Sequence, residues 1–116
     1  DEYLLHTMFD VDGALVGYGN IAPELLIELI AAGKAKDYAR ARALHDRLLP
    51  VTKSVYHRGS HMEGTVALKH ALVTRGILEH ATVRTPLLPL PDGAEVEIAN
   101  AMRSAGLAGK QAAIAA

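Results

Sequence analysis

The chain has 116 residues, of which 50% are hydrophobic and 22% charged, and its formal net charge is -1. That length suits one small domain and falls well short of the roughly 250 residues of a complete (β/α)8 barrel. The balanced charge offers no basic surface for nucleic acid, and no apolar run reaches the ~20 residues that cross a bilayer. The absence of cysteine excludes a disulfide framework and a thiolate nucleophile, and it is compatible with a cytoplasmic location.

The first twenty residues predict a helical turn followed by one short strand. Residues 1–9 carry apolar side chains at helical spacing, which predicts a short helix or the end of one. Residues 14–16, Ala-Leu-Val, form a brief apolar run between glycines, typical of a strand buried on both faces. Residues 17–20, Gly-Tyr-Gly-Asn, predict a turn whose backbone a ligand can approach closely. Because the chain opens without Met, we expect it to begin within a longer protein.

Two helices are predicted next. Pro23 suits the first turn of a helix that ends at Gly33. Asp37 can cap the following helix, in which Pro50 is expected to cause a kink or a break. The apolar face predicted for that helix consists of Ala39, Ala43, Leu44, Leu48, Val51 and Val55.

Two capping boxes predict the remaining helices. The run Ser60–Glu63 opens a helix that ends at Gly76, and Asp92–Glu95 opens one that finishes near Gly106. Between them, the prolines of residues 82–91 predict an extended connection.

One predicted strand therefore stands among five helical segments. A lone buried strand leaves backbone donors and acceptors unpaired, and each such group costs about 1–3 kcal/mol. Residues 82–85 are the other strand candidate, but they are charged and followed by proline. The strand at 14–16 is therefore predicted to pair with strands outside this chain. Helix, buried strand and helix in that order are typical of one slice of a (β/α)8 barrel.

Several short motifs follow one another along the chain in an order known from one protein family. They are Asp1-Glu2, the run DGALVGYGNIAPE at residues 12–24, KDYARA at 36–41, LLP at 48–50 and RTPLLPL at 84–90. In this order and spacing the chain resembles, over about residues 1–107, the dihydrodipicolinate synthase / N-acetylneuraminate lyase family of class I Schiff-base aldolases.

The resemblance implies an α/β fold class, with this chain as the C-terminal fragment of a (β/α)8 TIM barrel. Residues 1–33 would hold the last strand and last helix of the barrel, and 34–107 a helical C-terminal extension. Residues 108–116 are low in sequence complexity and are predicted to form a flexible tail. The chain as given is expected to be mostly helical.

The resemblance also implies a parent enzyme, a lyase or synthase that acts on pyruvate or a 2-keto acid without a cofactor. Such enzymes are commonly homotetramers and form an imine on a lysine of an earlier strand. The lysines of this chain lie on predicted helices, in their connections or in the tail: Lys34, Lys36, Lys53, Lys69 and Lys110. We therefore expect no catalytic residue here, and a fragment that is inactive alone.

Four positions are expected to line the substrate pocket of the parent. By family likeness, Leu15 would pack near the bound keto acid, and Gly17 takes the place of a substrate-contacting serine of the sialic acid lyases. Asp1 and Glu2 match an acidic pair that reaches substrate hydroxyls, a role that suits carboxylate acceptors. The alternatives are that Asp1 and Glu2 only cap a helix and that Leu15 is ordinary core.

No metal site is expected, because Gly59 and Ser60 interrupt the helical spacing of His57 and His61. The expected partners are a keto acid and further copies of the enzyme, with no nucleic acid and no membrane. The competing interpretation is a free-standing helical protein-interaction module without catalytic activity, which requires a lone strand to be tolerated.

Overall fold

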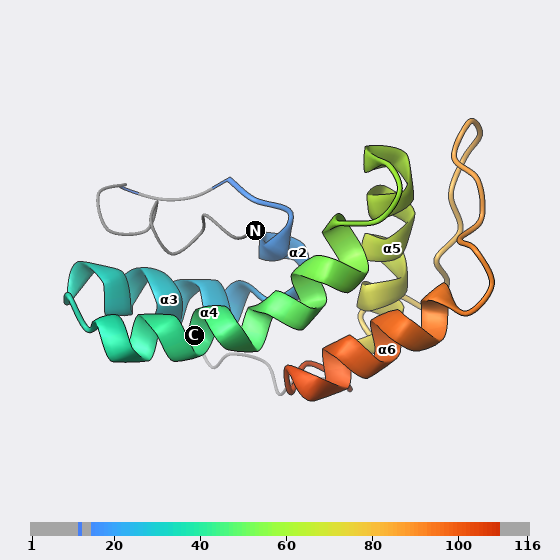
Figure 1. The fold of residues 1–116 in the computed structure, drawn as a ribbon. Helices are drawn as coiled ribbons and strands as arrows, with labels where there is room; N and C mark the ends of the chain where they lie inside the picture. The colour runs from blue at the N-terminus through green and yellow to red at the C-terminus, as the bar shows by residue number, and fades with distance from the viewer. Residues whose placement is uncertain (1–11, 13–14, 110–116) are drawn as a thin grey trace. The chain divides into compact units, whose positions relative to one another are not determined.

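The computed structural model describes Asp12 and residues 15–109, and the regular elements of this part are helices (Figure 1). In chain order they are α2 (Tyr18–Ile21), α3 (Pro23–Lys34), α4 (Tyr38–Val51), the π-helix η1 (Thr52–Tyr56), α5 (His61–Thr74) and α6 (Ala94–Ser104). The chain divides into two compact units, one up to Leu49 and one from Pro50. No helix in the described part is long and apolar enough to cross a membrane.

The described residues form no strand, which corrects the prediction for residues 14–16. Leu15 and Val16 have no regular secondary structure, and the Leu15 side chain is fully exposed rather than buried. The physical reason is the absence of a neighbouring strand in the described part: the Val16 carbonyl instead accepts the Gly19 N–H at 3.0 Å and enters a helical turn. Ala14 and the helix predicted over residues 1–9 lie outside the described residues.

The first unit is built around α2 and α3. Ala22, which is buried and has φ -149° and ψ 49°, separates the two helices, and Pro23 opens α3 as predicted. The predicted end of α3 at Gly33 is confirmed to within one residue, because the helix closes at Lys34. The side chains of α3 that supply the core are Leu25, Leu26, Leu29 and Ala32.

The cap of α4 is confirmed, while its apolar face is only partly as predicted. The Arg40 N–H donates to Asp37 Oδ1 at 3.0 Å. Ala39 and Ala43 are exposed, whereas Ala41 is fully buried. The buried stripe therefore runs through Ala41, Leu44, Leu48, Val51 and Val55, as helical spacing from Leu44 requires.

Pro50 does not break α4, so of the two expected outcomes, a kink or a break, the break is wrong and the kink stays a prediction. The α-helix continues to Val51 and then widens into η1, where the His57 N–H donates to the Thr52 carbonyl five residues earlier. Pro50 has no N–H to donate to the Asp46 carbonyl, so one hydrogen bond of the α-helix is missing there. The α-helical hydrogen-bond pattern changes to the π-helical one two residues later, at Thr52. Val55 of η1 is fully buried in the second unit.

The second unit packs α5 against both η1 and α6. Gly64 permits the close approach to η1, since a Cβ there would lie 3.3 Å from the Val55 carbonyl oxygen. The predicted stop of α5 is confirmed at Gly76, whose φ of 71° is left-handed. The cap predicted for α6 is wrong: Gly93, with φ 84°, is its N-cap, so Asp92 lies one residue before the cap.

The N-cap of α5 is confirmed and gives a direct test of this local structure. The Glu63 N–H donates to Ser60 Oγ at 3.1 Å. Replacing Ser60 by alanine is expected to lower the free energy of unfolding by about 1 kcal/mol, because a first-turn N–H loses its acceptor. Ser60→Asn, the matched control, keeps a side-chain oxygen that can accept this N–H and should cost only a few tenths of that unit. Urea unfolding monitored by circular dichroism measures both, and equal losses for the two variants would contradict the cap.

Candidate functional site

The two predicted substrate-facing positions that the structure describes lie together, just before α2. Leu15 presents its whole side chain to solvent, and Gly17 is half-buried at the N-cap of α2 with right-handed φ and ψ. Asp1 and Glu2, the other two predicted positions, lie outside the described residues. Whether Leu15 faces substrate or is ordinary core stays a prediction.

Buried side chains of the first unit hold this segment in place. Tyr18 and Ile21 on α2 are buried together with Ala22. The Gly17 carbonyl accepts the Asn20 N–H at 3.1 Å and Asn20 Nδ2 at 3.2 Å, which closes the turn. The chain from Gly17 to Ala22 is therefore anchored, and Leu15 projects from its beginning.

The described lysines occupy polar surroundings. Lys34, Lys36 and Lys53 are exposed, and Lys34 Nζ lies 3.5 Å from the Asp12 carbonyl oxygen. Lys69 is half-buried on α5, and its Nζ donates to the Thr82 carbonyl at 2.6 Å. An imine-forming lysine needs a desolvated or cation-flanked site, whereas Lys34, Lys36 and Lys53 are open to solvent. Lys110 lies outside the described residues.

Metal-ligating side chains do not gather anywhere in the part of the chain that the structure follows. No group of three or more His, Cys, Asp or Glu residues there could hold an ion. His57 and His61, the pair four residues apart, are both exposed.

A polar cluster that the sequence did not predict lies in the second unit. Arg58 Nε donates to Glu63 Oε1 at 2.8 Å, and its Nη1 donates to the Ser54 carbonyl at 2.8 Å and to Glu97 Oε2 at 3.1 Å. The Arg58 side chain is only 12% exposed. Burial lowers the pKa of its guanidinium, but hydrogen bonds and charge from Glu63 and Glu97 outweigh burial and raise that pKa overall. Through these hydrogen bonds the guanidinium of Arg58, which stays positively charged, links η1, α5 and α6.

Tyr56 lies beside this cluster in sequence, at the last position of η1. Its side chain is largely buried, and burial raises the pKa of its hydroxyl. The phenol is therefore neutral at physiological pH.

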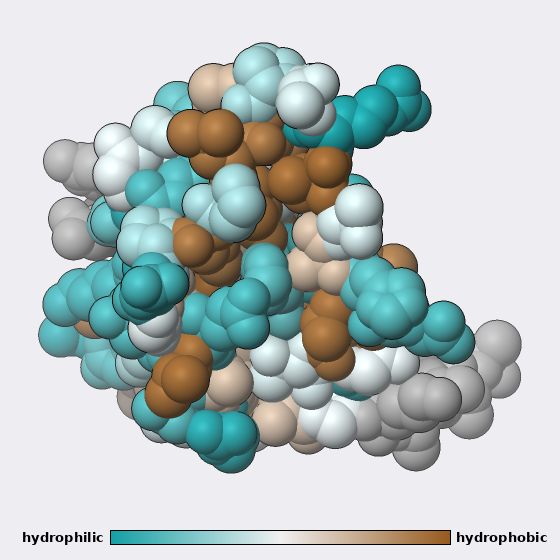
Figure 2. Space-filling model, turned by 90° about the vertical axis from the view of Figure 1, so that its right-hand side faces the viewer, coloured by the Kyte–Doolittle hydropathy of each residue, from teal (hydrophilic) through white to brown (hydrophobic). Residues whose placement is uncertain are grey.

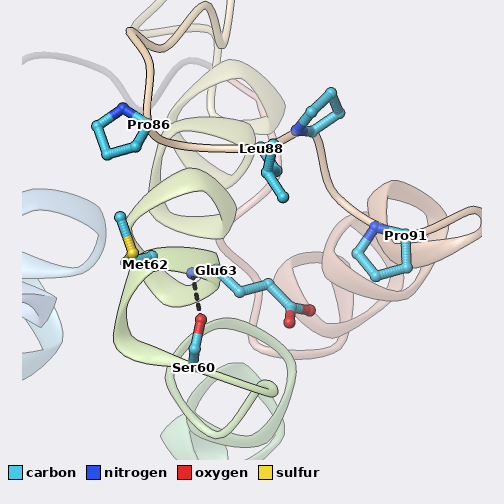
Figure 3. Close-up of a pocket in the computed structure, with 7 residues that line it drawn as sticks. Ser60, Met62, Glu63, Pro86, Leu88 and Pro91 are labelled. Atoms are coloured by element: carbon cyan, nitrogen blue, oxygen red, sulfur yellow. Dashed lines mark hydrogen bonds between the residues drawn. The ribbon is translucent and has the colours of Figure 1, made fainter.

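Two surface hollows of about 290 Å³ each flank the connection between α5 and α6. Figure 3 shows the first, where Met62 and Glu63 of the first turn of α5 face Pro86 and Leu88 of the connection. The second is lined by Val66, His70, Ala81, Thr82, Val83, Leu87, Pro89, Leu90 and Glu95. At its rim, His70 Nδ1 lies 3.5 Å from Glu95 Oε1. Leu15 and Gly17, the two predicted positions that the structure describes, line neither hollow.

Comparison with known proteins gives a consistent match. The sequence profile of the group described as "Dihydrodipicolinate synthetase family" matches residues 1–105. A protein named 4-hydroxy-tetrahydrodipicolinate synthase from Bartonella bacilliformis is 39% identical over 88 residues, which cover 76% of this chain and 28% of that protein. A protein of the same name from Kineococcus radiotolerans is 40% identical over 80 residues, which cover 69% of this chain and 25% of that protein. Another, from Bradyrhizobium diazoefficiens, is 33% identical over 96 residues, which cover 82% of this chain and 30% of that protein. The chain thus spans between 25% and 30% of the length of these relatives.

Proposed function

Because the chain belongs to the dihydrodipicolinate synthetase family, we propose that it is the C-terminal part of a Schiff-base-forming lyase or synthase that acts on pyruvate or a 2-keto acid. The observation that carries the proposal is the match over residues 1–105. The relatives are named as synthases, and each extends well beyond the part matched here. The parent would be a (β/α)8 barrel, with residues 1–33 at its end and 34–107 as a helical extension.

In this proposal the chemistry of the parent begins at a lysine outside these 116 residues. The neutral amine adds to the keto carbon, water leaves, and the cationic imine then withdraws electrons from the neighbouring carbon. A carbon–carbon bond can form or break there, or a sugar acid can lose water, without a cofactor. The polar surroundings of Lys34, Lys36, Lys53 and Lys69 support placing that lysine elsewhere.

The proposed contribution of this chain is part of the pocket wall. By family likeness, Leu15 and Gly17 would lie near the bound keto acid. The turn from Gly17 to Ala22 holds the two positions together just before α2. Asp1 and Glu2 would accept hydrogen bonds from substrate hydroxyls. The parent is expected to be a cytoplasmic homo-oligomer.

Borohydride trapping tests the proposed function. Incubating the full-length protein that carries these residues with pyruvate and sodium borohydride is expected to add the mass of one reduced pyruvate per chain, because hydride converts the imine into a stable amine. Lactate, which has no keto group, is the control and should add nothing. Intact-mass spectrometry reads both. No adduct with pyruvate or with a longer 2-keto acid such as 2-oxobutyrate would refute the proposal and favour the free-standing interaction module.

A further inference from the structure

A connection of unusual length joins α5 to α6, and we call its residues, 77–93, the strap. It contains no helix or strand and stands out in Figure 1 as the long loop between the two helices. Loops of more than about 12–15 residues without regular structure are uncommon in compact domains and usually have a function. The strap also keeps large apolar side chains at the surface, namely Ile77, Leu78 and Leu88.

The strap forms one wall of both hollows in the second unit. Pro86, Leu88, Pro89 and Pro91 line the first, and Ala81, Thr82, Val83, Leu87, Pro89 and Leu90 line the second. The opposite wall is α5 in both, through Met62 in the first and Val66 in the second. Figure 2 views the molecule from the side of the strap and shows hydrophobic side chains reaching the surface among hydrophilic ones. If the strap moved outward, both hollows would open along α5.

Hydrogen bonds tie the strap down at both ends and at one point between them. At its start the Ile77 N–H donates to the Leu72 carbonyl at 3.0 Å, and near its end the Ala94 N–H donates to the Pro91 carbonyl at 3.1 Å. Between these ends, Lys69 of α5 donates a hydrogen bond to the strap, through Nζ to the Thr82 carbonyl at 2.6 Å. A bond from an ammonium group to a carbonyl is stronger than one between neutral groups.

We propose that the strap is a movable cover over the α5 face and that Lys69 is the latch that keeps it closed. Segments with little regular structure and few buried contacts open locally at low free energy, independently of global unfolding. The latch sits in the middle of α5, so its release frees the part of the strap that lines the second hollow. This inference concerns a conformational device and does not depend on the proposed function.

Limited proteolysis tests the latch. Arg84 is exposed on the strap, and trypsin cleaves after it when the strap leaves α5. Lys69→Met keeps most of the side-chain length but removes the ammonium group, and it is expected to raise the rate of cleavage after Arg84 by roughly three- to tenfold, the net value of one hydrogen bond at a half-buried site. Lys69→Arg, which keeps the charge, should restore most of the protection. Lys53→Met, at an exposed lysine of η1, is the matched control and should leave the rate unchanged.

Cleavage after Lys53, which is exposed on η1 in the same unit as the strap, reports on unfolding of that unit and separates local from global effects. Mass spectrometry of the fragments follows both sites in one reaction. Acceleration after Arg84 alone supports the latch. An unchanged rate in Lys69→Met, or equal acceleration after Lys53, would overturn it, because the first shows that Lys69 holds nothing and the second that it acts only through the stability of the whole second unit.

Discussion

Replacing Ile98 by alanine is expected to lower the free energy of unfolding by about 2–5 kcal/mol, the range found when a large buried side chain is cut to a methyl group. Ile98 lies on α6 and is fully buried in the second unit. The loss has two parts, the hydrophobic transfer of the deleted groups and the cavity they leave in a packed interior. Urea unfolding followed by circular dichroism gives the value.

Val96 provides the matched control for Ile98. It lies two residues earlier on the same helix, but its side chain is 63% exposed. Val96→Ala should therefore change the free energy of unfolding by no more than about 0.5 kcal/mol. Equal losses for the two variants would mean that α6 does not bury the face described here.

The second large effect is expected at Arg58. Arg58→Met keeps an apolar stem but removes the guanidinium, and it should cost about 2 kcal/mol. The Ser54 carbonyl loses a donor, and the Glu63 carboxylate, which is 23% exposed, loses its cation in partly buried surroundings. We expect less than for a fully buried ion pair, because the Glu97 side chain is 65% exposed and screened by water.

Arg42 is the matched control for Arg58, because it is also an arginine in an ion pair but is exposed to solvent. It forms an i,i+4 pair with Asp46 at 3.2 Å, but its side chain is 70% exposed. Arg42→Met should therefore change the free energy of unfolding by no more than about 0.5 kcal/mol. If Arg58→Met were as mild in urea unfolding, the Arg58 cluster would not stabilise the second unit.

Signals confined to one helical turn predicted the local structure well. Asp37 and Ser60 cap α4 and α5 as expected, and Gly76 ends α5 in a left-handed conformation. Such features depend on a few neighbouring residues and so can be read from the sequence. At Asp92 the same reasoning failed, because Gly93 takes the cap position with a positive φ.

Features that depend on distant partners could not be predicted. Arg58 and Glu97 are 39 residues apart, and no sequence spacing indicates that they meet. The widening of α4 into η1 depends on how the helix absorbs Pro50, which the expectation of a kink or break did not specify. The strand at 14–16 was predicted from its own composition, whereas a strand forms only beside another strand.

The candidate site illustrates the same limit. The family likeness selected Leu15 and Gly17, and the structure places both before α2 with Leu15 fully exposed. What they meet in the parent enzyme depends on chain outside these residues. The division into residues 1–33, 34–107 and 108–116 likewise stays a prediction.

The most direct test of the proposed function is to locate the imine, not only to detect it. The full-length protein is trapped with pyruvate and borohydride and then digested, and the modified lysine is identified by mass spectrometry of the peptides. We predict a single modified lysine, which lies outside these 116 residues. The peptides of this chain that contain lysine are expected to be unmodified at Lys34, Lys36, Lys53, Lys69 and Lys110. A reduced pyruvate on any of these five lysines would contradict the account of this chain as pocket wall without the catalytic amine.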